Sequence, residues 1–266
     1  MPRRDSKMNL KLLIARAISE AMACASQFRP RRPGWRVLMY HAIGTPALED
    51  QRGLFSLSPE MFGKHLEVLS ALPRDLIVPF SSNALAGEGV RLSITFDDGY
   101  GDNLEVAAPL LAELDLPFTV FVSSEFVRGR RPGFMTPEAL RRLAGMPGAR
   151  VGAHGASHAS LTACNDAQLR SELVSSRHYL EDVIGMPVEM MAYPYGAVDQ
   201  RVRRAVEAAG YVLAACSHAG VNEADRDPLL IRRTEVLSHD NVRSFRQKLE
   251  GDWDWYRWRT QDPACA

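Results

Sequence analysis

Two adjacent aspartates, Asp97 and Asp98, follow a short apolar segment and stand directly before a glycine. Neighbouring carboxylates repel each other, so the pair is unfavourable unless a positive charge compensates it. Two histidines, His154 and His158, occur four residues apart in a later segment of mostly small residues. Two imidazoles and one carboxylate can bind a metal and leave one coordination position open for water. These residues therefore predict an open divalent metal site.

The two aspartates can take different roles in such a site. Successive side chains on an extended backbone point in different directions, so one carboxylate can reach the cation while the other stays free. A free carboxylate beside an activated water can accept its proton. Taken alone, the Asp-Asp-Gly segment also fits a solvated turn, and the histidines fit unrelated surface positions. Their joint occurrence in one chain favours the site.

The elements that must position these residues alternate between β-type and helical segments from Arg36 onward. The segments predicted as strands are 36–41, 92–96, 117–122, 149–154, 189–194 and 211–216. Helices are predicted over 58–72, 103–115, 136–145, 165–185 and 199–210, with Ser58 and Thr136 as N-caps. This order predicts parallel strands with crossover helices, hence an α/β sheet or barrel. Three polar clusters, around 97–98, 154–158 and 193–199, then fall at strand ends, where such folds gather their chemistry.

Three motifs carry a family resemblance: TFDDG at 95–99, HGASH at 154–158 and YPYG at 193–196. In this order and spacing they resemble the polysaccharide deacetylase family, the NodB-homology or carbohydrate esterase 4 group. The segment VLMYHAIG at 37–44 resembles the start of its exopolysaccharide deacetylases, so the resemblance runs from about 36 to 251. It implies a distorted, incomplete (β/α) barrel that removes N-acetyl groups from an amino-sugar polysaccharide or glycoconjugate. An O-acetyl esterase and a catalytically silent carbohydrate-binding relative are the alternatives.

The resemblance also assigns roles to residues. The metal ligands of the family match Asp98, His154 and His158. Asp97 matches its catalytic base. The implied cofactor is one divalent metal ion, and we expect zinc. The substrate is expected at Pro194 and Tyr195, with a backbone N–H near Tyr195 facing the oxyanion of the tetrahedral intermediate.

Two further histidines are candidates for the same site. His41, at the end of the first predicted strand, can face the substrate or serve as a packing residue. His239, in the segment LSHD, fits the family's general acid, which protonates the leaving amine. The same segment also fits a loop before a final helix capped by Asp240 or Asn241. His218 is a weaker candidate for the acid.

The chain departs from the family pattern beside its third motif. Many members carry an arginine shortly before the Pro-aromatic pair, where it pairs with the catalytic aspartate. Here Met191, Ala192 and Tyr193 occupy these positions. The sequence therefore shows no charge partner for Asp97 at the expected place.

Composition and charge exclude several other classes. The 266 residues are 46% hydrophobic and 24% charged, as in an ordinary globular protein. The formal net charge is zero, but residues 1–36 hold nine Lys and Arg against two acids. The basic excess lies in this arm, which argues against a nucleic-acid-binding body. The four cysteines lie far apart and form no zinc-ribbon pattern.

The basic arm also contains an apolar stripe at helical spacing. Its members are Leu10, Leu13, Ile14, Ala17, Ile18 and Ala21. Lys11, Arg16 and Glu20 interrupt the segment, so it fits neither a signal peptide nor a membrane span. A cytoplasmic location is therefore expected. The stripe can pack on the rest of the protein, or lie on an anionic membrane surface as a peripheral contact.

Domain limits follow from these segments. An N-terminal helix and linker are predicted over 1–35, the deacetylase-like domain over 36–251, and an aromatic tail over 252–266. The tail fits a carbohydrate or membrane contact, and it equally fits packing onto the barrel.

Overall fold

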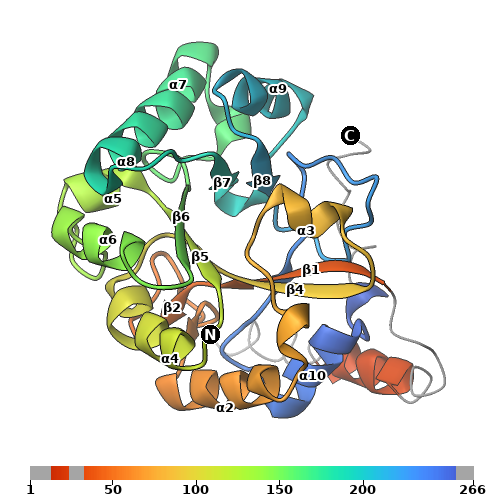
Figure 1. Cartoon of the computed structure of the whole chain (residues 1–266). Helices are drawn as coiled ribbons and strands as arrows, with labels where there is room; N and C mark the ends of the chain where they lie inside the picture. The colour runs from red at the N-terminus through yellow and green to blue at the C-terminus, as the bar shows by residue number, and fades with distance from the viewer. Residues whose placement is uncertain (1–12, 24–32, 256–266) are drawn as a thin grey trace, which may run out of the picture.

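The computed structural model describes residues 13–23 and 33–255. Its centre is a curled sheet of seven parallel strands in the order β8-β7-β6-β5-β4-β1-β9, which forms a half-barrel (Figure 1). The strands are β1 (Gly34–Tyr40), β4 (Val90–Phe96), β5 (Phe118–Val122), β6 (Ala149–Ala153), β7 (Met190–Ala192), β8 (Leu213–Ala215) and β9 (Thr234–Glu235). The six predicted strands and the α/β fold class are thus confirmed.

The central strands are buried along almost their whole length. In β4 every residue after Val90 is buried, and β1 shows the same pattern after Gly34. Strands that are covered on both faces need apolar or hydrogen-bonded polar side chains throughout. Thr95 meets this need because its hydroxyl donates to the Leu38 carbonyl at 2.7 Å.

Helices cover the outside of the sheet (Figure 1). They are α2 (Pro59–Ser70), α3 (Ser82–Ala86), α4 (Ala108–Glu113), α5 (Ser124–Arg128), α6 (Pro137–Ala144), α7 (Asp166–Arg170), α8 (Ser176–Ile184), α9 (Gln200–Ala208) and α10 (Val242–Glu250). One helix of residues 13–23 precedes them. The predicted caps Ser58 and Thr136 accept hydrogen bonds from backbone N–H groups at 3.2 Å, and Asn241 caps α10. Short α3 and α5 were not predicted.

Two smaller features complete the fold. A second, two-stranded parallel sheet pairs β2 (Ala42–Ile43) with β3 (Ser56–Leu57). One π-helical turn, Asn103–Ala107, precedes α4, and another, Ser171–Ser175, precedes α8. Predicted helices over 103–115 and 165–185 are therefore present, but each contains a π-helical turn.

The segment between β8 and α10 joins the two edges of the curled sheet. Ile231 forms a parallel bridge with Ala215 in β8, and β9 pairs with Leu38 and Met39 in β1. The chain therefore crosses from one sheet edge to the other within a few residues. Arg233 lies on this crossing, where its N–H donates to the His218 carbonyl at 3.0 Å.

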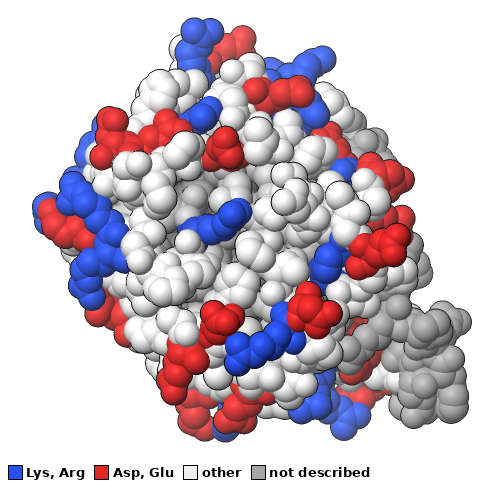
Figure 2. Space-filling model, viewed as in Figure 1, with Lys and Arg blue, Asp and Glu red and all other residues white. Residues whose placement is uncertain are grey.

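The surface carries charges of both signs. On the face shown in Figure 2, basic and acidic side chains are interspersed around the rim, without a broad basic area. Among the described residues, no helix combines the length and the apolar character needed to cross a membrane. At the start of the predicted tail, Asp254 pairs with Arg36 at 2.7 Å. The domain limits themselves stay a prediction.

Candidate active site

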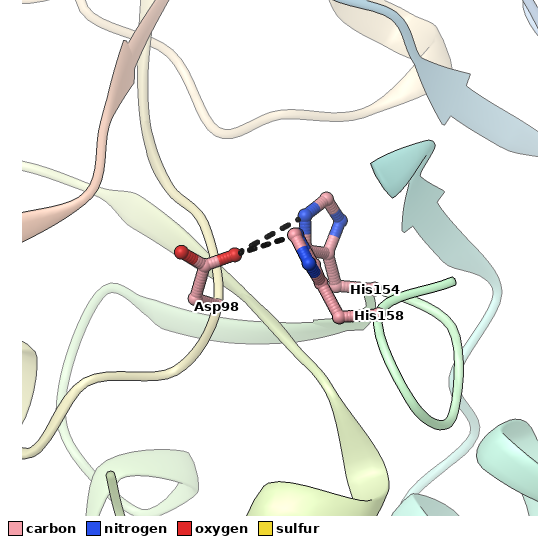
Figure 3. A group of neighbouring side chains, drawn as sticks. All are labelled: Asp98, His154 and His158. Carbon is pink, nitrogen blue, oxygen red and sulfur yellow. Dashed lines mark ion pairs between the residues drawn. The ribbon is translucent and has the colours of Figure 1, made fainter. Parts of the chain in front are cut away.

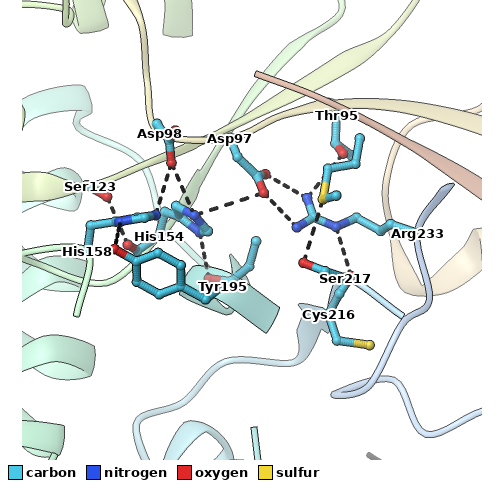
Figure 4. A network of polar contacts seen from close by, with 12 residues as sticks. Thr95, Asp97, Asp98, Ser123, His154, His158, Tyr195, Cys216, Ser217 and Arg233 are labelled. Carbon is cyan, nitrogen blue, oxygen red and sulfur yellow. Dashed lines mark hydrogen bonds and ion pairs between the residues drawn. The ribbon is translucent and has the colours of Figure 1, made fainter. Parts of the chain in front are cut away.

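The two aspartates lie in a strained turn at the carboxyl end of β4. The Asp97 N–H donates to the Tyr40 carbonyl at 3.0 Å, which continues the pairing with β1. Asp98 and Gly99 then adopt left-handed φ values of 74° and 85°. A Cβ atom on Gly99 would lie 3.0 Å from Val122 Cγ1, so glycine suits both the conformation and the space. The turn sends the Asp98 carboxylate to one side and the Asp97 carboxylate to the other (Figure 4).

Left-handed backbone marks other parts of this region too. Among the described non-glycine residues, φ is positive at only six positions, and three of these are Asp98, His158 and Tyr195. Such conformations cost free energy and persist where the surrounding structure enforces them, often at functional sites. Their concentration around one cluster therefore supports a functional site here.

Asp98 faces two imidazoles in a compact group (Figure 3). Its Oδ1 atom lies 3.4 Å from His154 Nε2 and 3.3 Å from His158 Nε2. The three ligand atoms lie within 4.8 Å of one another. Asp98 and His154 are buried, whereas the His158 side chain is 15% exposed, so the group opens on one side. The structure thus brings the three predicted ligands together.

Contacts on the far side of the imidazoles fix how these rings present their nitrogens. His154 Nδ1 lies 2.9 Å from the Ala192 carbonyl, which requires Nδ1–H as the donor. Its Nε2 lone pair then points at Asp98 when the ring is neutral. The Asp98 Oδ1 atom is buried and accepts no hydrogen bond. Three electron-pair donors that converge in this way, with a carbonyl behind one imidazole, fit a divalent cation.

Electrostatics around these residues favour positive charge. Burial would raise the pKa of Asp98, but the facing imidazoles hold it well below its usual range. Burial lowers the pKa of His154, but the carboxylates of Asp97 and Asp98 outweigh it and raise the pKa overall. The same negative potential that holds a proton on His154 would hold a metal ion, so the two compete.

Asp97 has a charge partner that the sequence did not reveal. Arg233 donates to both carboxylate oxygens of Asp97, at 2.6 and 2.7 Å, and both residues are almost completely buried (Figure 4). Burial would raise the pKa of Asp97, but the Arg233 guanidinium and the nearby His154 lower it. Asp97 is therefore ionised at neutral pH. Its Oδ2 atom lies 4.0 Å from His154 Nε2.

The crossing segment aims Arg233 at this carboxylate. Arg233 Nε donates to the Cys216 carbonyl at 3.1 Å, and its N–H is bound to His218. The backbone and the guanidinium of Arg233 are thus both held by carbonyls of residues just after β8. The arginine that is missing before the Pro-aromatic pair has a counterpart more than thirty residues further along the chain.

Glu172 holds the loop that carries the two histidines. Its carboxylate accepts from Ala156 N–H at 2.7 Å, from Ser157 N–H at 3.0 Å and from the Ser157 hydroxyl at 2.5 Å. A Cβ on Gly155 would lie 2.9 Å from this carboxylate, and Gly155 has a φ of 69°. The loop between His154 and His158 is therefore shaped by a buried acid, which the sequence analysis did not single out.

His41 lies close to the two aspartates. Its imidazole contributes to the lowered pKa of both Asp97 and Asp98, and its Nδ1 atom is buried without a hydrogen bond. The ring packs against Phe55, with 4.7 Å between ring centroids. The Asn103 side chain donates to the His41 carbonyl at 2.8 Å and fixes its backbone. The His41 imidazole thus acts electrostatically on both aspartates, and its Nδ1 atom has no hydrogen-bond partner.

His239 lies in other surroundings. Its carbonyl accepts from Arg16 at 3.1 Å. Burial lowers its pKa, and the charges that act on it belong to Asp240, Lys248 and Arg16. The role of His239 as general acid stays a prediction. His218 is buried, and its carbonyl accepts a hydrogen bond from the backbone N–H of Arg233.

The third motif forms the exposed side of the group. Pro194 is buried, whereas Tyr195 is 60% exposed with a φ of 58°. The Tyr195 hydroxyl lies 3.2 Å from His158 Nδ1 and 3.4 Å from a Glu49 carboxylate oxygen. Tyr195 therefore stands where a ligand would approach the imidazoles.

The fold is a curled parallel half-barrel of the α/β class. At its strand ends lie one aspartate with two histidines and a second aspartate that is paired with an arginine. This arrangement defines a candidate hydrolytic metal centre. Residues 86–214 match the family described as polysaccharide deacetylase. This range contains the three predicted ligands, but not His41, Arg233 or His239. Over this range, just under half of its length, the chain matches the polysaccharide deacetylase family.

Individual relatives agree with this assignment. The protein YxkH of Bacillus subtilis (strain 168) is 22% identical over 205 residues, which cover 75% of this chain and 70% of YxkH. The Streptococcus pyogenes deacetylase PplD, solved in complex with acetate, has 21% identity and a TM-score of 0.70, with 81% of this chain and 98% of PplD covered. A polysaccharide deacetylase from Bacillus cereus has 24% identity and a TM-score of 0.69, and the match covers 81% of this chain and 69% of the Bacillus cereus protein. The structural likenesses show the common fold.

Proposed function

We propose that this protein is a metal-dependent hydrolase that removes N-acetyl groups from an amino-sugar polysaccharide or glycoconjugate. The observation that carries the proposal is the convergence of Asp98, His154 and His158 beside an ionised Asp97. The match of residues 86–214 to the polysaccharide deacetylase family supports deacetylation of a carbohydrate. The relative PplD was solved in complex with acetate, and acetate is a product of deacetylation.

The chain's own residues divide the work of hydrolysis. A divalent cation bound by the three ligands would polarise the acetyl carbonyl and acidify water, and zinc suits the donor set. Asp97 accepts the proton of the attacking water, because Arg233 keeps its carboxylate ionised and fixed in direction. A backbone N–H near Tyr195 stabilises the oxyanion as it develops. Acetate and a free amine are the products.

Protonation of the leaving amine needs an acid within reach of the amine nitrogen. His239 is the candidate by its place in the segment LSHD, and His218 is a weaker one. His41 is a third candidate, because its imidazole acts electrostatically on both aspartates. His239 has a lowered pKa, which leaves its ring mostly neutral at neutral pH. Tyr195 and Pro194 would then line the sugar-binding side.

Acetate release from two kinds of oligosaccharide tests the proposal. Purified protein, loaded with zinc, is incubated with N-acetylated amino-sugar oligosaccharides and with O-acetylated neutral-sugar oligosaccharides. We expect acetate from the N-acetylated series, and its loss after chelation with recovery when the metal is restored. Release only from the O-acetylated series would identify an esterase. Binding of oligosaccharide without release of acetate would identify a silent relative.

A further inference from the structure

The helix of residues 13–23 sits on the domain through its polar groups. Its two buried residues, Ala15 and Ser19, are small. Arg16 donates to the His239 carbonyl at 3.1 Å, and the Trp255 indole N–H donates to the Ser19 hydroxyl at 3.1 Å. Glu20 forms an ion pair with Arg243 of α10. Figure 1 shows this helix, in red, beside α10. The side of the helix that contacts the protein is therefore the polar side.

The apolar stripe of the same helix faces outward. Leu13 is 60% exposed, Ile14 52%, and Ile18 and Met22 39% each. Residues 14, 18 and 22 are four apart, so their side chains form one line along the helix. Among the described residues only seven large hydrophobic side chains are exposed, and four of them lie here. The sequence alternative in which the stripe packs on the protein is therefore wrong for the described residues, and Leu10 lies outside them.

An apolar line of this kind on a surface marks a contact with a partner. The charge of the surrounding sequence indicates which partner. Residues 1–36 carry nine basic residues against two acids, and the basic excess remains without Arg36, which is buried and paired with Asp254. Glu20 is paired with Arg243. A second copy of the chain would bring two such positive arms together, which is unfavourable. An anionic lipid surface offers both apolar depth and negative charge.

We infer that the helix of residues 13–23 lies on an anionic membrane surface with Leu13, Ile14, Ile18 and Met22 inserted. The polar clamp formed by Arg16, Ser19 and Glu20 connects it to the domain, so the whole protein is held at that surface. Apolar burial and attraction of basic residues to acidic headgroups contribute together in such contacts. The inference does not depend on the proposed reaction.

Sedimentation of the full chain with vesicles tests this inference. We expect the protein to pellet with vesicles of equal parts phosphatidylglycerol and phosphatidylcholine, and much less with pure phosphatidylcholine or in high salt. The double variant Ile14→Ser/Ile18→Ser should lower the partition coefficient about tenfold or more, because it removes two of the four inserted apolar side chains. Its melting temperature should stay unchanged, since both side chains are exposed.

The matched control is Val212→Ser, which replaces another apolar residue of similar exposure, 51%, just before β8. It should pellet like the wild-type protein. The inference is overturned if the wild-type protein does not pellet, or if both variants lose binding equally. A marked fall in melting temperature of the double variant would show that the stripe packs internally. A wild-type dimer that the double variant dissociates would assign the stripe to a second copy.

Discussion

Asp97→Asn is expected to lower the turnover of N-acetylated substrate by about 10²–10⁴-fold while the protein keeps its metal. An amide has nearly the same shape as a carboxylate, but it cannot accept the proton of the attacking water at neutral pH. Asp97 is not among the three residues that converge as ligands, so the ion should stay bound. Acetate release and metal content, measured on the same preparation, check both parts.

Asp98→Asn provides the matched comparison, because it makes the same chemical change at the adjacent residue. Asp98 Oδ1 faces both imidazoles, so this variant should lose metal affinity as well as turnover. Because each variant also changes a buried contact, a thermal melt must show that both are folded at the assay temperature. Near wild-type turnover in Asp97→Asn would remove Asp97 as the base. Equal loss of metal in both variants would contradict the division of roles.

Arg233→Met should destabilise the fold by about 3–5 kcal/mol at pH 7, the usual effect of removing one member of a buried ion pair. Arg233 is completely buried and makes two hydrogen bonds to Asp97. Methionine fills much of the volume but leaves the carboxylate without a partner in a buried place. The midpoint of chemical unfolding, compared with that of the wild-type protein, measures the loss.

The double variant Asp97→Asn/Arg233→Met tests whether this loss comes from the pair. Without the carboxylate no uncompensated charge remains, so the double variant should be more stable than the sum of the two single effects predicts. Additive losses would contradict the pair as a coupled unit.

The pH dependence of stability has a definite sign for this pair. The pKa of Asp97 in the folded protein lies below its ordinary value of 3.8. The Asp97–Arg233 pair therefore makes its full contribution to the free energy of unfolding above pH 3.8, and this contribution is lost as the pH falls through the lower pKa of Asp97 in the folded protein. The stability difference between the wild-type protein and Arg233→Met should accordingly be large at pH 7 and shrink in acid.

The strands and most helices could be predicted because their patterns are local. Alternation such as Leu92, Ile94 and Phe96 identifies a strand, and a hydroxyl before Pro59 or Pro137 identifies the start of a helix. The ends of parallel strands meet at one sheet edge, so the topology alone brings Asp98 near His154. Residues at strand ends were therefore the predictable part of the site.

The remaining contacts depend on tertiary structure. Arg233 reaches Asp97 across 136 residues of sequence, through a crossing segment that has only two residues of regular strand. Glu172 reaches the histidine loop from a π-helical turn. Neither contact leaves a periodic pattern. The apolar stripe of residues 13–23 was visible in the sequence, but periodicity does not tell which side of a helix faces the protein.

Metal analysis of the purified protein and of His154→Ala/His158→Ala tests the central claim most directly. After extensive dialysis against metal-free buffer, the wild-type protein should retain about one divalent ion per chain. The double variant should retain almost none, because a site with three protein ligands cannot lose two of them and still hold the ion. Full occupancy in the folded double variant would contradict the assignment of Asp98, His154 and His158 as the metal site.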